Sequence, residues 1–323
     1  METILNKTTN SKEIAIQSLK GDKFAVAKLI SLFENTKSEF NENKKEIVEF
    51  LKKNSKTNGF FVGITGTPGA GKSTLLGKLS LEILKKEENI KIAILAIDPS
   101  SEISGGSLLG DRTRLKLPYD ENRIFFRSQA SDRELGGLGK HTFSVCRILY
   151  YLFDIVFIET VGIGQSEIEI HKIADYLFLV LQPFMGDQIQ FMKSGIMEVP
   201  NAFIINKWEE KKEAQKTYYA LRSSLSLIYP NSKEIPIFPT SALNGFGISD
   251  LANFILNLRD KNKGNSLLQK EIYFFYKWVK NEYGNKGIEL LNSKGGAKKY
   301  LEFYNSLDLA IEEFSKIKYT FQL

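Results

Sequence analysis

Apolar residues follow two different spacings along the chain, and the changes between them divide the sequence into three parts. In residues 12–54 they recur every three or four positions, as they do along one face of a helix. From about residue 260 this helical spacing returns. The part between contains short runs that are apolar throughout, at residues 60–64, 92–97, 155–158, 176–181, 202–205 and 235–238. Such runs, alternating with helix-length segments, indicate a parallel sheet that is covered on both faces.

These patterns predict an α/β protein with a mostly parallel central sheet covered by helices. We expect a helical N-terminal segment over residues 1–57, a central domain over 58–260 and a helical extension over 261–323. Residues 272–279, IYFFYKWV, are apolar around most of a helix circumference, so this helix needs cover on several sides. A tail of this length builds little core of its own, so it is expected to pack on the main domain or against a second copy.

The composition is that of a soluble globular protein, with 42% hydrophobic and 25% charged residues. No apolar run approaches the roughly 18 residues of a membrane helix, and the N-terminus lacks a secretion signal. We therefore expect a cytoplasmic protein without a membrane partner. The chain has a single cysteine, Cys146, which excludes an internal disulfide framework. With only two histidines besides, it is also not a Cys/His-rich metal carrier.

The net charge of +6 does not by itself indicate a nucleic-acid partner. The excess of basic residues lies in the flanks, residues 1–58 and 261–323, where it is interleaved with acids along the expected helices. A nucleic-acid-binding protein usually carries a concentrated basic stripe. Solvated helix faces explain this pattern better, and no nucleic-acid partner is expected.

The strongest chemical signal is GTPGAGKST at residues 66–74, which fits the pattern G-x-x-x-x-G-K-[ST]. It directly follows an apolar run and directly precedes a helix-like segment, which is the context that this phosphate-binding loop requires. Its glycines let backbone N–H groups converge on phosphate oxygens at a helix N-terminus. We expect Lys72 to reach the β- and γ-phosphates and the Ser73 hydroxyl to ligate Mg²⁺. The predicted phosphate-binding residues are Gly66, Thr67, Pro68, Gly69, Ala70, Gly71, Lys72, Ser73 and Thr74.

Two acids, Asp98 and Glu159, each end an apolar run. The carboxyl ends of parallel strands face the crevice where ligands bind, and there an acid can hold Mg²⁺ directly or through water. One such acid could equally well cap the next turn, but two beside a phosphate-binding loop favour the metal site. Between them, the glycine-rich segment at residues 105–112 is typical of a mobile loop that closes over phosphate.

The base is expected to lie against two further strand ends, which carry NKWE at residues 206–209 and SAL at 241–243. GTPases have N-K-x-D and S-A-x at these places. There the carboxylate accepts hydrogen bonds from guanine N1–H and N2–H₂, and a backbone amide contacts O6. Glu209 stands at the usual aspartate, and its extra methylene is expected to lower affinity. A carboxylate still repels the N1 lone pair of adenine, so GTP is favoured over ATP. The predicted base-binding residues are Asn206, Lys207, Glu209, Ser241, Ala242 and Leu243.

Taken together, the motifs resemble the MeaB/ArgK group of P-loop GTPases. They run in the order of that group, and the N-terminal segment around Gly21 and Asp22 also looks like its entry helices. The sequence departs from the group at Glu209 and at Gly139, where alanine or serine is common. The strings that carry the resemblance are GTPGAGKST (66–74), IDPSSEISGGSLLGDRTRL (97–115), LGGLGKHT (135–142), IETVGIGQSE (158–167), GDQIQFMKSGI (186–196), INKWE (205–209) and TSALNGFGI (240–248).

The resemblance implies a chaperone that gates cofactor loading of an adenosylcobalamin-dependent acyl-CoA mutase of the methylmalonyl-CoA mutase type and protects or reactivates it. Its GTPase activity would be slow alone and stimulated by the mutase, and its C-terminal helices would form a homodimer. Adenosylcobalamin would belong to the partner, since the chain has no D-x-H-x-x-G string.

The resemblance also implies roles for individual residues. The Mg²⁺ environment would be Ser73, Asp98, Asp111 and Glu159, and the catalytic residues Lys72, Asp111, Glu159 and Lys193. Asp187, Gln188 and Lys193 would couple nucleotide state to the partner. From the residues alone, a helix N-cap at Asp187 and a solvated Lys193 is the plainer interpretation.

Other P-loop proteins remain as alternatives. A nickel-inserting metallochaperone GTPase should carry Cys/His ligands, and a signal-recognition-type GTPase should carry a Met-rich extension, whereas this chain has four Met. A small-molecule kinase is harder to exclude. It should prefer ATP, and the NKWE and SAL strings argue against that preference.

Overall fold

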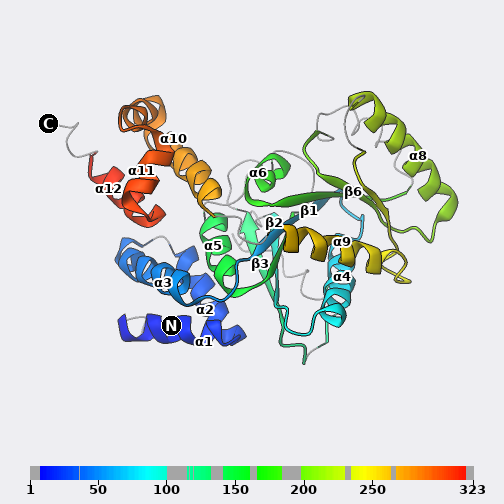
Figure 1. Ribbon diagram of the computed structural model, residues 1–323, viewed down its shortest axis with the longest axis horizontal. Coiled ribbons are helices and arrows are strands. Elements are labelled where there is room, and N and C mark those ends of the chain that lie inside the picture. The colour runs from blue at the N-terminus through cyan, green and yellow to red at the C-terminus, as the bar shows by residue number, and fades with distance from the viewer. Residues whose placement is uncertain are drawn as a thin grey trace.

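The computed structural model describes residues 8–35, 37–99, 115, 117–118, 120–131, 141–160, 166–183, 198–229, 234–262 and 267–317. Within them, seven strands form one sheet in which each neighbouring pair is parallel (Figure 1). The predicted fold class is therefore confirmed. In spatial order the strands are β3 (Ile124–Ser131), β2 (Ile92–Pro99), β4 (Ile155–Thr160), β1 (Phe60–Gly66), β5 (Tyr176–Leu181), β6 (Ala202–Ile205) and β7 (Ile237–Pro239).

The six predicted runs all contribute strands, but the prediction was wrong in two details. The last strand, expected at residues 235–238, is β7, which begins and ends later. The edge strand β3 was not predicted at all. Its second half contains Arg127, Ser128 and Gln129, which interrupt the apolar run. An edge strand pairs with one neighbour only, so it tolerates polar residues that a central strand would exclude.

Helices cover both faces of the sheet (Figure 1). None of the described helices is both long enough and apolar enough to cross a membrane. The helices that alternate with the strands along the chain are α4 (Lys72–Lys86), α5 (Thr142–Leu152), α6 (Ser166–Ile173), α8 (Lys211–Ile228) and α9 (Ile248–Lys261). Those of the flanks are α1 (Thr8–Leu19), α2 (Lys23–Glu34), the 3₁₀ turn η1 (Ser38–Phe40), α3 (Asn41–Asn54), α10 (Leu268–Ser293), α11 (Gly296–Tyr304) and α12 (Leu307–Ile317).

Side chains of each strand alternate between the two faces and so enter different cores. In β1, Val62 and Ile64 pack with α4 and α9 on one face, whereas Phe61 packs with α5 and the flanking helices on the other. A third, smaller core lies between α8 and the β5–β6 part of the sheet. The central strand β1 is thereby buried over its whole length, which gives the loop that follows it a rigid base.

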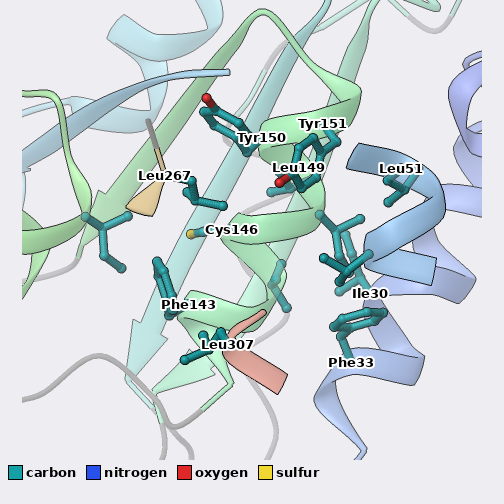
Figure 2. Close-up of a cluster of buried hydrophobic side chains, with 14 of the residues drawn as sticks. Ile30, Phe33, Leu51, Phe143, Cys146, Leu149, Tyr150, Tyr151, Leu267 and Leu307 are labelled. Carbon is teal, nitrogen blue, oxygen red and sulfur yellow. The ribbon is translucent and has the colours of Figure 1, made fainter. Parts of the chain in front are cut away.

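Helix α5 joins both ends of the chain to the sheet. Its buried side chains lie between Ile30 and Leu51 from the N-terminal helices and Leu267 and Leu307 from the C-terminal part (Figure 2). Its single cysteine, Cys146, is fully buried, and burial raises the pKa of the thiol. Because the buried side chains of α5 share one core with the described C-terminal helices, these helices pack on the main body. The division at residues 57/58 and 260/261 stays a prediction, as does a homodimer.

A buried ion-paired arginine strengthens this connection. Arg147 of α5 is 2% exposed, and its Nε donates to Glu271 Oε1 of α10 at 3.0 Å. Its two terminal nitrogens donate to Asp308 Oδ1 and Oδ2 of α12 at 3.0 and 2.9 Å. Burial by itself lowers the pKa of the guanidinium, but the two carboxylates more than offset this and hold it above its ordinary value. Three helices are thus joined by one side chain.

Candidate nucleotide-binding site

The predicted phosphate-binding loop connects β1 to α4 at the carboxyl edge of the sheet. Its backbone requires glycine at two close approaches. A Cβ on Gly66, whose φ is +146°, would lie 2.1 Å from Val180 O of the neighbouring strand β5. A Cβ on Gly71, whose φ is +81°, would lie 2.7 Å from Asn206 Nδ2. The loop therefore folds back tightly over the strand ends, and α4 begins directly after it at Lys72.

The Lys72 side chain turns back onto this loop. It is 6% exposed, and its Nζ donates to Gly66 O at 2.8 Å and to Thr67 O at 3.1 Å. The hydroxyl of Thr67 is buried and has no partner among the described residues. A buried hydroxyl without a partner costs free energy. A bound phosphate is one group that would provide that partner.

A hydroxyl and a carboxylate meet beside the loop. Ser73 Oγ donates to Glu159 Oε1 at 2.8 Å, and Glu159 is 4% exposed at the end of β4. Next to it, Thr160 Oγ1 donates to Thr65 Oγ1 at 3.0 Å and joins the ends of β4 and β1. The backbone of Asp98 lies at the same edge, because Ala96 of β2 pairs with Glu159. Hydroxyl and carboxylate oxygens are the ligands that Mg²⁺ prefers, so this set fits that ion.

Asn206 joins the phosphate-binding loop to the predicted base-binding loop. Its Nδ2 donates to Ala70 O at 2.8 Å. Its Oδ1 accepts from the backbone N–H of Ala242 at 3.1 Å and from Thr240 Oγ1 at 3.3 Å. Asn206 is 2% exposed, so these bonds are shielded from water. The three strings around residues 70, 206 and 242, far apart in the sequence, therefore meet at one edge of the sheet.

The remaining predicted base-binding residues surround Asn206. Lys207 has a left-handed backbone, with φ +59°, and its Nζ donates to Gln182 Oε1 at 2.6 Å. Glu209 is exposed in the turn before α8. Ser241 is buried, with its Oγ accepting from Asn244 N at 3.3 Å, whereas Leu243 is 78% exposed. An exposed carboxylate beside a shielded loop is accessible to a ligand from solvent.

Several predicted residues lie outside the described part of the chain. These are Asp111, Asp187, Gln188 and Lys193, together with the side chain of Asp98 and the glycine-rich segment at 105–112. Among the described residues, no group of three or more His, Cys, Asp or Glu side chains could hold a metal ion.

Sequence reasoning missed Gln182, Thr65 and Thr160, which the fold adds to the site. Gln182 directly follows β5, so it lies at the carboxyl end of a parallel strand, as Asp98 and Glu159 do, and could have been expected at the site for the same reason. Its uncharged side chain gave no chemical signal, and its partner Lys207 is 25 positions away.

A glycine-rich loop between a central parallel strand and a helix, with a Ser–Glu pair beside it, defines a P-loop nucleoside triphosphatase. Comparison with known proteins narrows this class. The chain belongs to the family described as "Methylmalonyl Co-A mutase-associated GTPase MeaB", whose sequence model matches residues 26–281. The resemblance seen in the motifs is thereby confirmed.

Individual relatives agree with this assignment. A putative GTPase of Pyrococcus abyssi is 38% identical over 273 residues, which cover 80% of this chain and 82% of the relative. The Caenorhabditis elegans protein named "Methylmalonic aciduria type A homolog, mitochondrial" is 38% identical over 176 residues, covering 53% and 43% of the two chains. Among solved structures, one titled "LAO/AO transport system kinase" matches with a TM-score of 0.62. It is 20% identical and covers 97% of this chain and 99% of its own, so it shows the fold alone.

Proposed function

We propose that this protein binds and hydrolyses GTP and uses the cycle to gate cofactor loading onto an adenosylcobalamin-dependent acyl-CoA mutase of the methylmalonyl-CoA mutase type. The observation that carries the proposal is membership of a family described as mutase-associated GTPases. The name of the Caenorhabditis elegans relative, which refers to methylmalonic aciduria, supports the same partner class. Adenosylcobalamin is proposed to belong to the partner only.

Binding of the phosphates would draw on the loop and on Lys72. The Nζ of Lys72 now bonds two carbonyls of the loop, and phosphate oxygens carrying full negative charge are stronger acceptors than carbonyls. Gly71 places the N-terminus of α4 at the loop, where backbone N–H groups and the helix dipole favour anions. Charge that builds on the phosphates during attack by water would be neutralised by these groups, which are already in position.

Ser73 and Glu159, with Asp98 and Asp111, are the residues proposed to hold Mg²⁺. When bound, this ion would neutralise charge on the β- and γ-phosphate oxygens. The hydrogen bond between Ser73 Oγ and Glu159 Oε1 holds both oxygens within 2.8 Å of each other beside the loop. Catalytic roles are proposed for Lys72, Asp111, Glu159 and Lys193.

Recognition of guanine is proposed for Asn206, Lys207, Glu209 and residues 241–243. Asn206 supports the base site indirectly, because its amide already bonds Ala70 O and the N–H of Ala242. Glu209 is exposed and so can turn its carboxylate toward N1–H and N2–H₂ of the base. Asp187, Gln188 and Lys193 are proposed to couple the nucleotide state to the mutase.

The proposal is tested by measuring GTP turnover of the purified protein with and without the adenosylcobalamin-dependent mutase of the same organism. We expect slow turnover alone and a rise of several-fold on mixing, because segments that order on the γ-phosphate can be stabilised by a partner. A panel of nucleotides in a thermal-shift assay is the control. Greater stabilisation by ATP than by GTP would contradict the GTPase assignment and favour a kinase, while unchanged turnover would contradict the partner.

Replacing Glu209 with aspartate is expected to tighten GDP binding by roughly tenfold, about 1.4 kcal/mol, because the shorter side chain meets the base without a retracted rotamer. Isothermal titration of GDP and ADP measures the change. Glu210→Asp, one position along the same turn, is the matched control and should leave the affinity unchanged. Weaker GDP binding by Glu209→Asp would show that the loop is built for the longer glutamate.

A further inference from the structure

Gln182 lies between two parts of the nucleotide site that approach from different strands. It directly follows β5, which lies in the sheet between β1 and β6. On one side, Gly66 of the phosphate-binding loop pairs with Val180, which is two residues before Gln182. On the other, the backbone N–H of Asn206 donates to Leu181 O at 2.9 Å. Any side chain at position 182 therefore stands between the phosphate-binding loop and the NKWE string.

The carboxamide of Gln182 contacts Lys207 and lies near Gly69 of the phosphate-binding loop. Its Oε1 accepts a hydrogen bond from Lys207 Nζ at 2.6 Å. A lysine ammonium only donates, so the oxygen, not the nitrogen, must face it. On the other side, a Cβ built on Gly69 would lie 3.7 Å from Gln182 Nε2 and 3.8 Å from Oε1. The amide therefore occupies the space beside Gly69, where a larger residue would meet it, while it bonds the lysine.

Lys207, which Gln182 contacts, has an unusual backbone conformation. Its φ of +59° lies in the left-handed region, which costs a residue with a Cβ about 1 kcal/mol or more. The turn after it is held by two backbone bonds, Trp208 N to Thr240 O at 3.0 Å and Glu210 N to Lys207 O at 3.1 Å. These bonds fix the backbone but leave four side-chain torsions of the lysine free. The bond to Gln182 fixes the far end of that side chain.

We propose that Gln182 is a positioning residue for guanine nucleotides: it anchors the Lys207 ammonium against the phosphate-binding loop, so that the lysine stem lies ready along the plane of the base. This inference rests on the proposed function, since it assigns the base site to Lys207. Asn206 and Gln182 then form two separate bridges from the phosphate-binding loop to the base site. Asn206 bonds Ala70 O, whereas Gln182 lies near Gly69.

The first experiment compares GDP binding by Gln182→Leu and Gln182→Glu with that of the wild-type protein. Leucine keeps the volume and removes the acceptor, so we expect GDP affinity to fall about tenfold, the size of one lost charge-assisted hydrogen bond. Glutamate keeps the length and the acceptor and is expected to remain within about threefold. Affinity for pyrophosphate, which has no base, should stay within about twofold for both variants. Melting of the nucleotide-free proteins checks that all of them fold.

The second experiment repeats Gln182→Leu in a Lys207→Met background. If Gln182 acts through the lysine, Gln182→Leu should have little effect once Lys207 is methionine. We then expect GDP affinity to fall by less than a further factor of about two. The same tenfold loss in both backgrounds would show that Gln182 only packs on Gly69, and would overturn the inference. A folded Gln182→Leu protein with unchanged GDP affinity would also overturn it.

These outcomes separate the inference from the function on which it rests. Wild-type protein that binds ADP more tightly than GDP would overturn the guanine site and the role of Gln182 with it. Wild-type protein that prefers GDP, together with an unaffected Gln182→Leu variant, would overturn the role of Gln182 alone.

Discussion

Replacing Lys72 with alanine is expected to lower GTP hydrolysis by about 10³-fold while the protein still folds. The ammonium is buried against the loop and donates to two carbonyls, five and six positions earlier in the chain. Removal of the charge takes away the donor that would follow the β- and γ-phosphates into the transition state. None of the three hydrophobic cores formed by the described residues includes this side chain, so the fold should survive.

The measurement is phosphate release at saturating GTP, accompanied by near-UV circular dichroism to verify the fold. Lys78→Ala is the matched control, because Lys78 is an exposed lysine on the same helix, α4. It is expected to hydrolyse GTP at the wild-type rate. A folded Lys72→Ala protein that retains more than a tenth of wild-type turnover would contradict the role proposed for Lys72 in hydrolysis.

Replacing Arg147 with methionine is expected to lower the free energy of unfolding by about 3–5 kcal/mol. The guanidinium is 2% exposed and makes three charge-assisted bonds, at 2.9–3.0 Å, to Glu271 and Asp308. Methionine fills much of the volume but leaves two partly buried carboxylates without their counter-charge. Because α5, α10 and α12 all meet at this residue, the loss should loosen the C-terminal helices from the main body. Urea unfolding followed by circular dichroism and tryptophan fluorescence measures the change.

The control removes all three charges together. In Arg147→Met with Glu271→Gln and Asp308→Asn, no carboxylate is left unpaired, so most of the lost stability should return. If the triple variant is as unstable as Arg147→Met alone, packing of the arginine stem matters more than its charge. A loss below about 1 kcal/mol in the single variant would contradict the inferred role of the ion pairs.

The phosphate-binding part of the site could be predicted because its residues lie close together in the sequence. A run of nine residues contains the glycines, the lysine and the serine, and the strand and helix around it follow from short-range patterns. Glu159 could be placed beside it because the ends of parallel strands share one edge. The structure brings Ser73 and Glu159 together at 2.8 Å across 86 positions, as that argument expects.

Other features depended on contacts that have no local signature. β3 was missed because its polar residues interrupt the apolar pattern of a strand. Its strand conformation depends on pairing with the neighbouring β2. Gln182 was missed because a glutamine after a strand has no distinctive chemistry until Lys207 lies opposite it. The C-terminal extension had two expected places, on the main body or against a second copy. The buried bonds of Arg147 show the first for the described helices.

Patterns along the chain were enough to establish the class of fold, the phosphate-binding loop, the order of the strand-end motifs and the family. These depend on residue spacing and on backbone preferences that act over a few positions. The folded chain was needed to show that Asn206 bonds the phosphate-binding loop, that Gln182 bonds Lys207, and that Arg147 ties α10 and α12 to α5. Such pairings bring together residues that are 25 to 161 positions apart, and chain closure over those distances is set by the whole core and not by local pattern.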